Sequence, residues 1–400
     1  MVGTYASGRR LPEFKLLLYD PLTSPKMTQQ SSRIDLSPDI ESLSVSTQMD
    51  GGYTALSVGY DKLIHFPAGE ERHFGRLQKP AELRDFAHVA LMEGKRAVWE
   101  GRALLPDLPG GRLQMFQAKG YGYTATMDKP YLNTSTQEQT SGQILREAIT
   151  SCAPTLTIAG PSHYVDPGVY HPYNSFNYQM PSQIIQQILT DGDTQGNQQK
   201  FTVYERRLVS LMPQTAPTRP TYIVDFTGDV DWQRNLDGCY GAVYYQYSGG
   251  SQPAVYVECP QSLSVWSDQH GGLVRIGSQN GGTLTDAEAL AKATTWINAN
   301  SNAIVAGTFT IGGRFWGDVQ GLRLASGGTR APWLVRAGQT VQVADQGTYF
   351  IAQTQFDCNS LQLKVSLGTT AFNQDRMIAR LRTVAGHYVN GTNAVSGAAA

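Results

Sequence analysis

The chain has 400 residues and a mass of 43.7 kDa. It is longer than a chain built around a single hydrophobic core usually is, because such cores stop growing at roughly 250 to 300 residues. Its 32 Lys and Arg residues balance 33 Asp and Glu residues, so the formal net charge is -1 and no overall field attracts nucleic acid or acidic lipid. Only 16% of the residues are charged, whereas 41 are Gly, 20 are Tyr and 20 are Pro. This balance is typical of β-rich chains.

Neither export nor membrane insertion is indicated. The first ten residues contain no apolar run of signal-peptide length, and no stretch of about 18 uncharged apolar residues occurs anywhere. The four cysteines, Cys152, Cys239, Cys259 and Cys358, form no CxxC pair, which argues against a zinc cluster or a redox dithiol. We expect buried free thiols and synthesis in a reducing cytoplasm.

Residues 1–132 are predicted to form a first β-barrel domain, because strand patterns alternate with turn formers such as Asp50-Gly51-Gly52. One hairpin is expected around that turn and a second around Glu93-Gly94-Lys95-Arg96. The expected strands are Phe14–Tyr19, Ser42–Ser46, Thr54–Tyr60, Phe86–Met92, Ala97–Arg102 and Arg112–Tyr121.

The period then becomes helical, so residues 133–213 are predicted to be an inserted α/β domain. Thr140-Ser141-Gly142-Gln143 offers an N-cap and a capping box for a helix that ends before Pro154. A second helix is expected from Pro181, with Gly192 as its stop. A short strand, Phe201–Glu205, follows before the linker of residues 214–220.

Residues 214–266 and 303–370 are predicted to form a second β-barrel domain, interrupted by a small helical insertion at 267–302. Thr285-Asp286-Ala287-Glu288 is a capping box for the inserted helix. Its apolar face is expected to carry Ala287, Leu290, Thr294 and Ile297. The expected strands of the barrel are Tyr222–Phe226, Ala242–Tyr247, Ala254–Cys259, Gln339–Val343, Thr348–Ala352 and Leu361–Leu367, the last with strict apolar and polar alternation.

The last residues, 371–400, are expected to hold a helix and a flexible tail. Arg376, Arg380 and Arg382 lie on its basic segment; a solvated helix face explains them better than nucleic-acid contact. The predicted fold class is thus β-rich α+β: two tube-like antiparallel β-barrel domains with helix-containing inserted domains.

Catalytic chemistry is not indicated. The sequence contains no GxSxG, HExxH or P-loop pattern, so we predict no catalytic, cofactor-binding or metal-binding residue and no cofactor. His163, Asp166 and His171 lack the helical spacing of metal ligands and fit a loop better. Paired carboxylates for glycoside cleavage cannot be recognised by sequence spacing.

Three further segments have an ordinary structural interpretation. Asp191-Gly192-Asp193 begins like a calcium loop, but Thr202 stands at position 12, where a carboxylate is required, so we expect a helix-ending turn. Gly120-Tyr121-Gly122-Tyr123 is expected to be strand and turn. An aromatic run could stack on sugars, although internal packing is favoured: Tyr164, Tyr170, Tyr173, Phe176 and Tyr178.

Several passages, in their order along the chain, resemble the hub proteins of bacteriophage tails. The likeness spans about Leu43 to Leu367. The passages are Arg96–Arg102, Ile144-Leu145-Arg146, Val165-Asp166-Pro167-Gly168, Gln183-Ile184-Ile185, Tyr204-Glu205-Arg206-Arg207, Asp229-Val230-Asp231-Trp232, Val243–Tyr247, Pro332–Gly338 and the final Leu-x-Leu-x-Val strand.

The resemblance implies a homotrimer in which each chain contributes two barrels, matching the hexameric tail tube and closing its distal end until genome ejection. The implied partners are the tail tube or distal tail protein, the tape measure protein and tail fibre or spike proteins. Genomic DNA would pass without sequence-specific binding, and the location would be the virion tail tip, assembled in the host cytoplasm. Two alternatives remain: a carbohydrate-binding or glycan-cleaving β-protein, and a hexameric distal-tail scaffold.

Overall fold

The computed structural model describes residues 13–19, 33–35, 37, 40–60, 87–104, 116–126, 138–153, 156–158, 165–171, 180–214, 220–224, 230–235, 238–301, 304–312, 322–344 and 347–368. Two compact units comprise Met1–Thr369 and Thr370–Ala400. The second unit, with the helix and tail expected at 371–400, lies outside the described residues.

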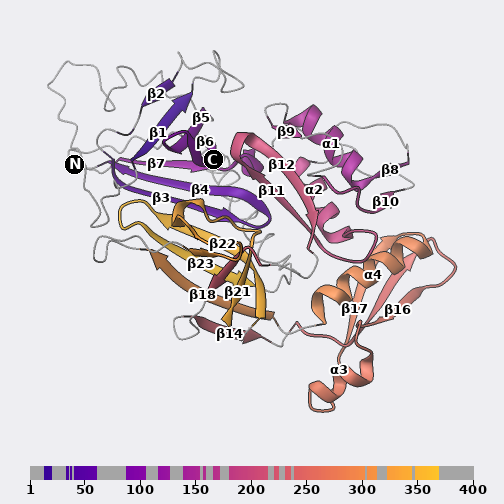
Figure 1. The fold of residues 1–400 in the computed structure, drawn as a ribbon. Helices are drawn as coiled ribbons and strands as arrows, with labels where there is room; N and C mark the ends of the chain where they lie inside the picture. Colours follow the sequence, from indigo (N-terminus) through magenta and orange to yellow (C-terminus); the bar gives the residue numbers. More distant parts are fainter. Residues whose placement is uncertain are drawn as a thin grey trace, which may run out of the picture. The chain divides into compact units, whose positions relative to one another are not determined.

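The first β-region is an antiparallel series with the order β2-β1-β5-β6-β7-β4-β3 (Figure 1). Both expected hairpins are confirmed, β3 with β4 and β5 with β6. The strands are β1 (Phe14–Tyr19), β2 (Arg33–Asp35), β3 (Ile40–Gln48), β4 (Gly51–Tyr60), β5 (His88–Glu93), β6 (Arg96–Leu104) and β7 (Phe116–Tyr121).

The last β-region has the order β14-β18-β23-β22-β21-β13-β19-β20, in which every pair is antiparallel except the parallel pair of β21 with β13. The alternation expected in its final strand is confirmed, since Leu363, Val365 and Leu367 are buried and the residues between them are not. The elements are β13 (Tyr222–Val224), β14 (Asp231–Asn235), β18 (Ile304–Gly312), β19 (Leu322–Leu324), β20 (Thr329–Arg330), η5 (Pro332–Leu334), β21 (Thr340–Val343), β22 (Gly347–Asp357) and β23 (Gln362–Gly368).

The two β-regions are joined through a direct pairing of β22 with β3 (Figure 1). Along one edge of β22, residues 347–350 pair with β21 and residues 353–357 pair with β3. Thr47 and Thr354, on facing strands, approach within 2.5 Å through their hydroxyl oxygens. The expectation of a β-rich chain is confirmed. The strand pairings of the described residues, however, form one continuous network in which no sheet is closed, so the two barrels remain a prediction.

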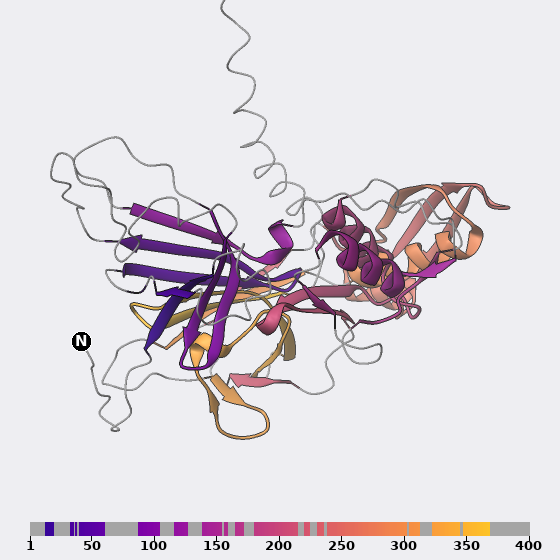
Figure 2. The ribbon, with the colours of Figure 1, turned by 90° about the horizontal axis from the view of Figure 1, so that it is seen from above.

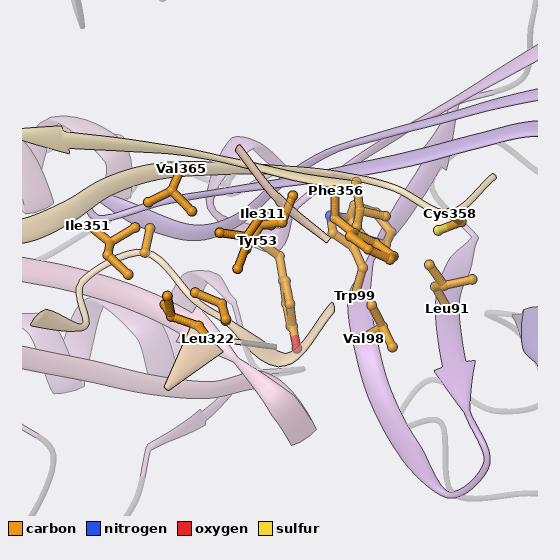
Figure 3. Packing of buried hydrophobic residues seen from close by; sticks show 14 of the residues in the cluster. Tyr53, Leu91, Val98, Trp99, Ile311, Leu322, Ile351, Phe356, Cys358 and Val365 are labelled. Carbon is orange, nitrogen blue, oxygen red and sulfur yellow. The ribbon is translucent and has the colours of Figure 1, made fainter. Parts of the chain in front are cut away.

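One hydrophobic core serves both β-regions. Figure 3 shows Tyr53 and Trp99 of the first region in the same cluster as Ile311 and Phe356 of the last. The ring of Phe14 adds two edge-on contacts across the boundary, with centroid distances of 5.7 Å to Trp333 and 5.8 Å to Phe356. Edge-to-face contacts of this kind are favourable for aromatic rings. The shared core explains why the regions pair directly.

The inserted α/β region contains both expected helices. Thr140 and Gln143 form the predicted capping box, and Gly192 ends the second helix with a φ of 76°. Strand β11 pairs in parallel with β4 at Thr202 and Val203, which attaches this region to the first β-region. The elements are η3 (Tyr123–Thr126), β8 (Gln139–Thr140), α1 (Ser141–Cys152), β9 (Thr157–Ile158), β10 (Tyr170–His171), α2 (Pro181–Asp191), β11 (Gln199–Tyr204), η4 (Glu205–Arg207) and β12 (Leu208–Pro213).

A separate three-stranded sheet, β16-β15-β17, belongs to the small module of residues 238–301. Helix α4 lies against this sheet (orange in Figures 1 and 2). Strands β15 and β16, expected in the second barrel, thus pair here with β17, which was not expected. The elements are β15 (Ala242–Ser248), β16 (Ala254–Glu258), α3 (Leu263–Gln269), β17 (Ile276–Thr283) and α4 (Asp286–Asn300). The domain boundaries as a whole stay a prediction.

The capping box of α4 at Thr285 and Glu288 is confirmed, but the face predicted for this helix is largely wrong. Of the four residues expected there, Ile297 is buried, whereas Leu290 is 49% exposed. The buried residues of α4 are Ala289, Ala293, Thr295 and Ile297, and the first, second and last of these follow one another at four-residue spacing. Small alanines allow the helix to approach the sheet closely.

Candidate functional site

Arg336 lies where three parts of the chain meet. Its Nη1 donates to the carbonyl oxygen of Trp333 at 2.7 Å, and its Nη2 lies 3.3 Å from both the Tyr53 hydroxyl and the Ala97 carbonyl oxygen. The same nitrogen lies 3.2 Å from Oε1 of Glu205. Only 8% of the Arg336 side chain is exposed. One guanidinium thus links the first β-region, the α/β region and the last β-region.

The residues after Arg336 continue this junction. Ala337 donates its amide to Thr47 Oγ1 at 3.0 Å and accepts a 2.7 Å hydrogen bond from the Tyr204 hydroxyl. Gly338 accepts a 2.8 Å hydrogen bond from Lys200 Nζ. We call Tyr53, Ala97, Tyr204, Glu205 and Arg336–Gly338 the Arg336 junction. Most of its bonds reach across more than 100 residues of sequence.

Burial sets the protonation of the tyrosines in the Arg336 junction. Burial raises the pKa of Tyr53 and of Tyr204 well above the usual tyrosine value, because a phenolate is poorly solvated in the interior. Both hydroxyls therefore stay neutral, and Tyr53 also presents its ring to the guanidinium at 5.2 Å. The carboxylate of Glu205, with 48% of its side chain exposed, is the counter-charge of Arg336.

A half-open cavity of about 460 Å³ lies beside the Arg336 junction. The tip of the β5–β6 hairpin, η4, β20 and η5 supply its walls, and Glu205 belongs to both the cavity and the junction. Its size falls in the range of about 300 to 1,000 Å³ that ligand pockets usually have. Its lining includes both charged and apolar side chains.

A second buried charge lies in the β3–β4 turn. Burial raises the pKa of Asp50 from 3.8 to about 7, and its Oδ1 is buried with no hydrogen-bond partner among the described residues. A carboxylate in such a position is costly unless it takes up a proton. Asp50 is therefore a group whose charge state changes near neutral pH.

Ser141, His171 and Asp191 lie together but do not form a catalytic triad. Ser141 Oγ is 3.0 Å and Asp191 Oδ2 is 3.8 Å from the same nitrogen, Nε2 of His171, whereas a triad needs its acid and its nucleophile on opposite ring nitrogens. Ser141 and Asp191 are at most 1% exposed. Burial lowers the pKa of His171, so Lys292 Nζ, 2.8 Å from Asp191 Oδ1, is the charged partner of Asp191. This cluster fixes α2 against α4.

The other residues considered in the sequence have structural roles where they are described. Asp166 accepts hydrogen bonds from the Gly168 amide at 2.8 Å and from Gln199 at 3.0 Å, and His163 lies outside the described residues. Asp193 Oδ1 accepts from the amides of Gln195 and Asn197, which confirms the turn after α2. No group of three or more potential metal ligands occurs in the part of the chain that the structure describes.

The aromatic run is described only at Tyr170, which is 47% exposed; Tyr164, Tyr173, Phe176 and Tyr178 lie outside the described residues. Gly120–Tyr123 forms the end of β7 and the start of η3, as predicted. All four cysteines are free and buried, as predicted. Among the described helices none has the length and apolar character needed to cross a membrane.

The Arg336 junction was not predicted as a site, although the sequence held a signal for it. Three passages that carry the resemblance to tail hubs, those around Ala97, Glu205 and Arg336, meet in this junction. Each passage has no distinctive motif, and the contacts of the junction join residues as far apart as 290 positions, from Thr47 to Ala337. Only their convergence in space reveals a common role.

The chain matches no known protein family and no curated protein. Three solved structures nevertheless share its fold. The 43 kDa tail protein of prophage MuSo2 from Shewanella oneidensis is 12% identical, with 88% of this chain and 97% of that chain covered at a TM-score of 0.56. Prophage tail protein gp18 from Listeria monocytogenes EGD-e is 10% identical, with 93% of this chain and 99% of that chain covered at a TM-score of 0.56. The tail protein from Neisseria meningitidis MC58 is 8% identical, with 89% of this chain and 96% of that chain covered at a TM-score of 0.54. The chain therefore has the fold of these tail proteins.

Proposed function

We propose that this chain is the structural hub of a phage tail tip. The observation that carries the proposal is the likeness of fold to three tail proteins, which extends over 96% or more of each of their chains. A match of this extent means that the likeness involves the whole fold of those proteins and not a small shared motif. The part of the chain that the structure describes offers no arrangement suited to catalysis, and we propose a role through shape and assembly.

In this proposal the chain acts as a homotrimer. The first and last β-regions of each chain would act as two similar units, so three chains would present six such units to the hexameric tail tube. The β-network of one chain ends in strands with an unpaired edge among the described residues, such as β14 and β20. Neighbouring copies would complete the barrels by pairing with such edges, since unpaired edges favour association.

The proposed location is the virion tail tip, with assembly in the host cytoplasm. The partners are the tail tube or distal tail protein, the tape measure protein, and fibre or spike proteins. The trimer would close the distal end of the tube until genome ejection and then let DNA pass without reading its sequence. A formal net charge of -1 suits a channel that must not hold DNA by counterion release.

The proposal is tested by counting the copies of this chain in the purified assembly and around the tail axis. The purified chain, alone and mixed with its tail-tube partner, is analysed by light scattering after gel filtration, and particles are imaged along the tail axis. We expect a species of about three times 43.7 kDa and threefold symmetry at the tip. Sixfold symmetry would instead identify a distal-tail scaffold. A monomer in every mixture that binds or cleaves glycans would overturn the proposal.

A further inference from the structure

The cavity beside the Arg336 junction has an unusual electrostatic lining. Three cationic side chains face it: Lys95 and Arg96 from the hairpin tip and Arg330 from β20. None of the three side chains has a hydrogen-bond or ion-pair partner among the described residues, and Nε of Arg330 is buried without a partner there. A buried donor without a partner costs about 1 to 3 kcal/mol. The cavity therefore lacks an acceptor at this position.

Two carboxylates share the cavity wall, but both are already engaged. Glu205 pairs with Arg336, and Glu100 Oε2 lies 3.3 Å from the backbone amide of Arg207. When Arg336 is counted with its partner Glu205, the four cations outnumber the two carboxylates. The excess positive charge lies on the hairpin tip and on β20, away from the Arg336–Glu205 pair. An incoming anion would meet these unpaired cations.

The rest of the lining is apolar and comes from Met92, Ala97 and Leu334. An inorganic ion alone would leave this surface uncovered. A carboxylate carried on a chain with apolar neighbours would satisfy both parts of the lining, because charge-assisted hydrogen bonds to arginine are strong and apolar contacts add burial. Glu100 and Glu205 also disfavour a doubly charged phosphate relative to a single carboxylate.

From these observations we propose that the cavity binds an acidic side chain of a partner protein segment, flanked by apolar residues. Arg330 is the main recognition residue because it lines the cavity and its side chain has no hydrogen-bond partner among the described residues, and Lys95 and Arg96 hold the carboxylate from the hairpin side. Leu334 and Met92 contact the flanking apolar side chains. The inference stands on the cavity alone and does not depend on the proposed tail role.

The test uses methionine-methyl NMR on the full chain, with the peptide acetyl-Leu-Glu-Leu-amide as the probe. Met92 lines the cavity and serves as the reporter, whereas Met212, 41% exposed on β12, serves as the internal control. We expect the peptide to shift the Met92 signal in a saturable manner and to leave Met212 in place. The matched peptide acetyl-Leu-Gln-Leu-amide should bind at least about tenfold more weakly, because it lacks the charge.

Substitutions inside and outside the cavity test whether the peptide binds there. Arg330→Gln should weaken peptide binding roughly tenfold or more, and Arg96→Gln, at the exposed hairpin tip, provides a second variant if the first fails to fold. Lys364→Gln, which removes an exposed lysine of β23 outside the cavity, should leave binding unchanged. Equal binding of the two peptides, an unmoved Met92 signal, or equal losses in the cavity and control variants would overturn the proposal.

The same probe distinguishes the source of the segment. If a second copy supplies it, excess peptide should lower the mass of any self-associated species in sedimentation. If another protein supplies it, the peptide should leave that mass unchanged and compete only with the partner. Both results require the cavity to bind the acidic peptide, and neither tests whether the assembly is a trimer.

Discussion

Two charged groups with buried atoms, Arg336 and Asp50, differ in how the fold surrounds them. The two terminal nitrogens of Arg336 bond carbonyl oxygens and the Glu205 carboxylate, and its guanidinium lies over the Tyr53 ring, while its Nε has no partner among the described residues. Asp50, in the β3–β4 turn, has one carboxylate oxygen buried without a partner among the described residues. A buried charge is stable when other groups replace its water shell and costly when they do not. Arg336 therefore supports the folded state, whereas ionised Asp50 opposes it.

Asp50 should make stability fall as pH rises toward neutrality. Its pKa is 3.8 in an ordinary environment and about 7 in the folded chain, so the folded state holds a proton that the unfolded state has lost between these values. The penalty is absent below about pH 4 and complete above about pH 7, where we expect it to be on the order of 2 to 4 kcal/mol. Asp50→Asn should remove it.

Urea unfolding at about pH 5 and about pH 8.5 measures this effect. We expect Asp50→Asn to raise the free energy of unfolding at the higher pH and to change it far less at the lower one. Asp357→Asn, at an exposed aspartate that ends β22, is the matched control. The same gain at both pH values would show that Asp50 does not titrate as its environment indicates.

At the residue scale, sequence reasoning succeeded where the partner is near in the chain. The capping pairs Thr140 with Gln143 and Thr285 with Glu288 are separated by three residues, and a short spacing fixes their geometry. Arg336 meets residues 131 to 283 positions away. Nothing in the residues around Arg336 identifies Tyr53 or Glu205 as partners.

Helix α4 shows how the elements pack. Its residues Ala289, Ala293 and Ile297 are fully buried, and Ala293 and Ile297 belong to a core that includes Val243 of β15. The prediction from the sequence placed Leu290 at this contact because large apolar side chains are usually buried. The buried positions of α4 are instead occupied by the small side chains of Ala289 and Ala293. Size, and not hydrophobicity alone, decides which stripe faces inward.

This arrangement predicts opposite sensitivities for neighbouring positions of α4. Ala293→Leu should lower the free energy of unfolding by about 1 to 3 kcal/mol, because the added methyl groups overpack the contact with the sheet. Leu290→Ala should change it by less than about 0.5 kcal/mol, since that side chain is 49% exposed. Thermal and urea unfolding of the two variants provide the measurement. A larger loss in Leu290→Ala than in Ala293→Leu would contradict the packing.

Strand β18 was not predicted, because its glycines resemble turn residues. Gly307 pairs with Trp232 of β14, and a Cβ at position 307 would lie 2.7 Å from the indole ring. The glycine therefore makes room for a ring across the strands and does not mark a loop. Glycine in a strand can reflect such a close approach, but one sequence cannot distinguish this from a turn.

At the scale of the whole molecule, the two β-regions share strands and core. Alternating residues in β3 and β23 correctly indicated sheets with one buried face. They could not indicate which strand pairs with which, because the alternation defines a face and not a neighbour. The β22–β3 pairing and the common core join the two regions for which the order of elements suggested separate barrels.

A shared core should make the two β-regions unfold together. With 5-fluorotryptophan incorporated, Trp99 reports on the first region and Trp333, which packs on the same core, on the last. We expect the two fluorine signals to disappear at the same urea concentration, within error. Phe356→Ala, at the core between them, should lower both midpoints together and cost about 3 to 5 kcal/mol. Two separate midpoints would show that each region is stable by itself.

The β22–β3 pairing also limits how far the protein can fold during its synthesis on the ribosome. Thr47 can contact Thr354 only after the ribosome has added 307 further residues. At a translation rate of about 5 to 20 residues per second, this takes roughly 15 to 60 seconds. During translation the early strands must remain soluble without their eventual neighbours. The nascent chain is thus exposed to chaperones and proteases for most of its synthesis, and the final sheet can assemble only once the last strands have left the exit tunnel.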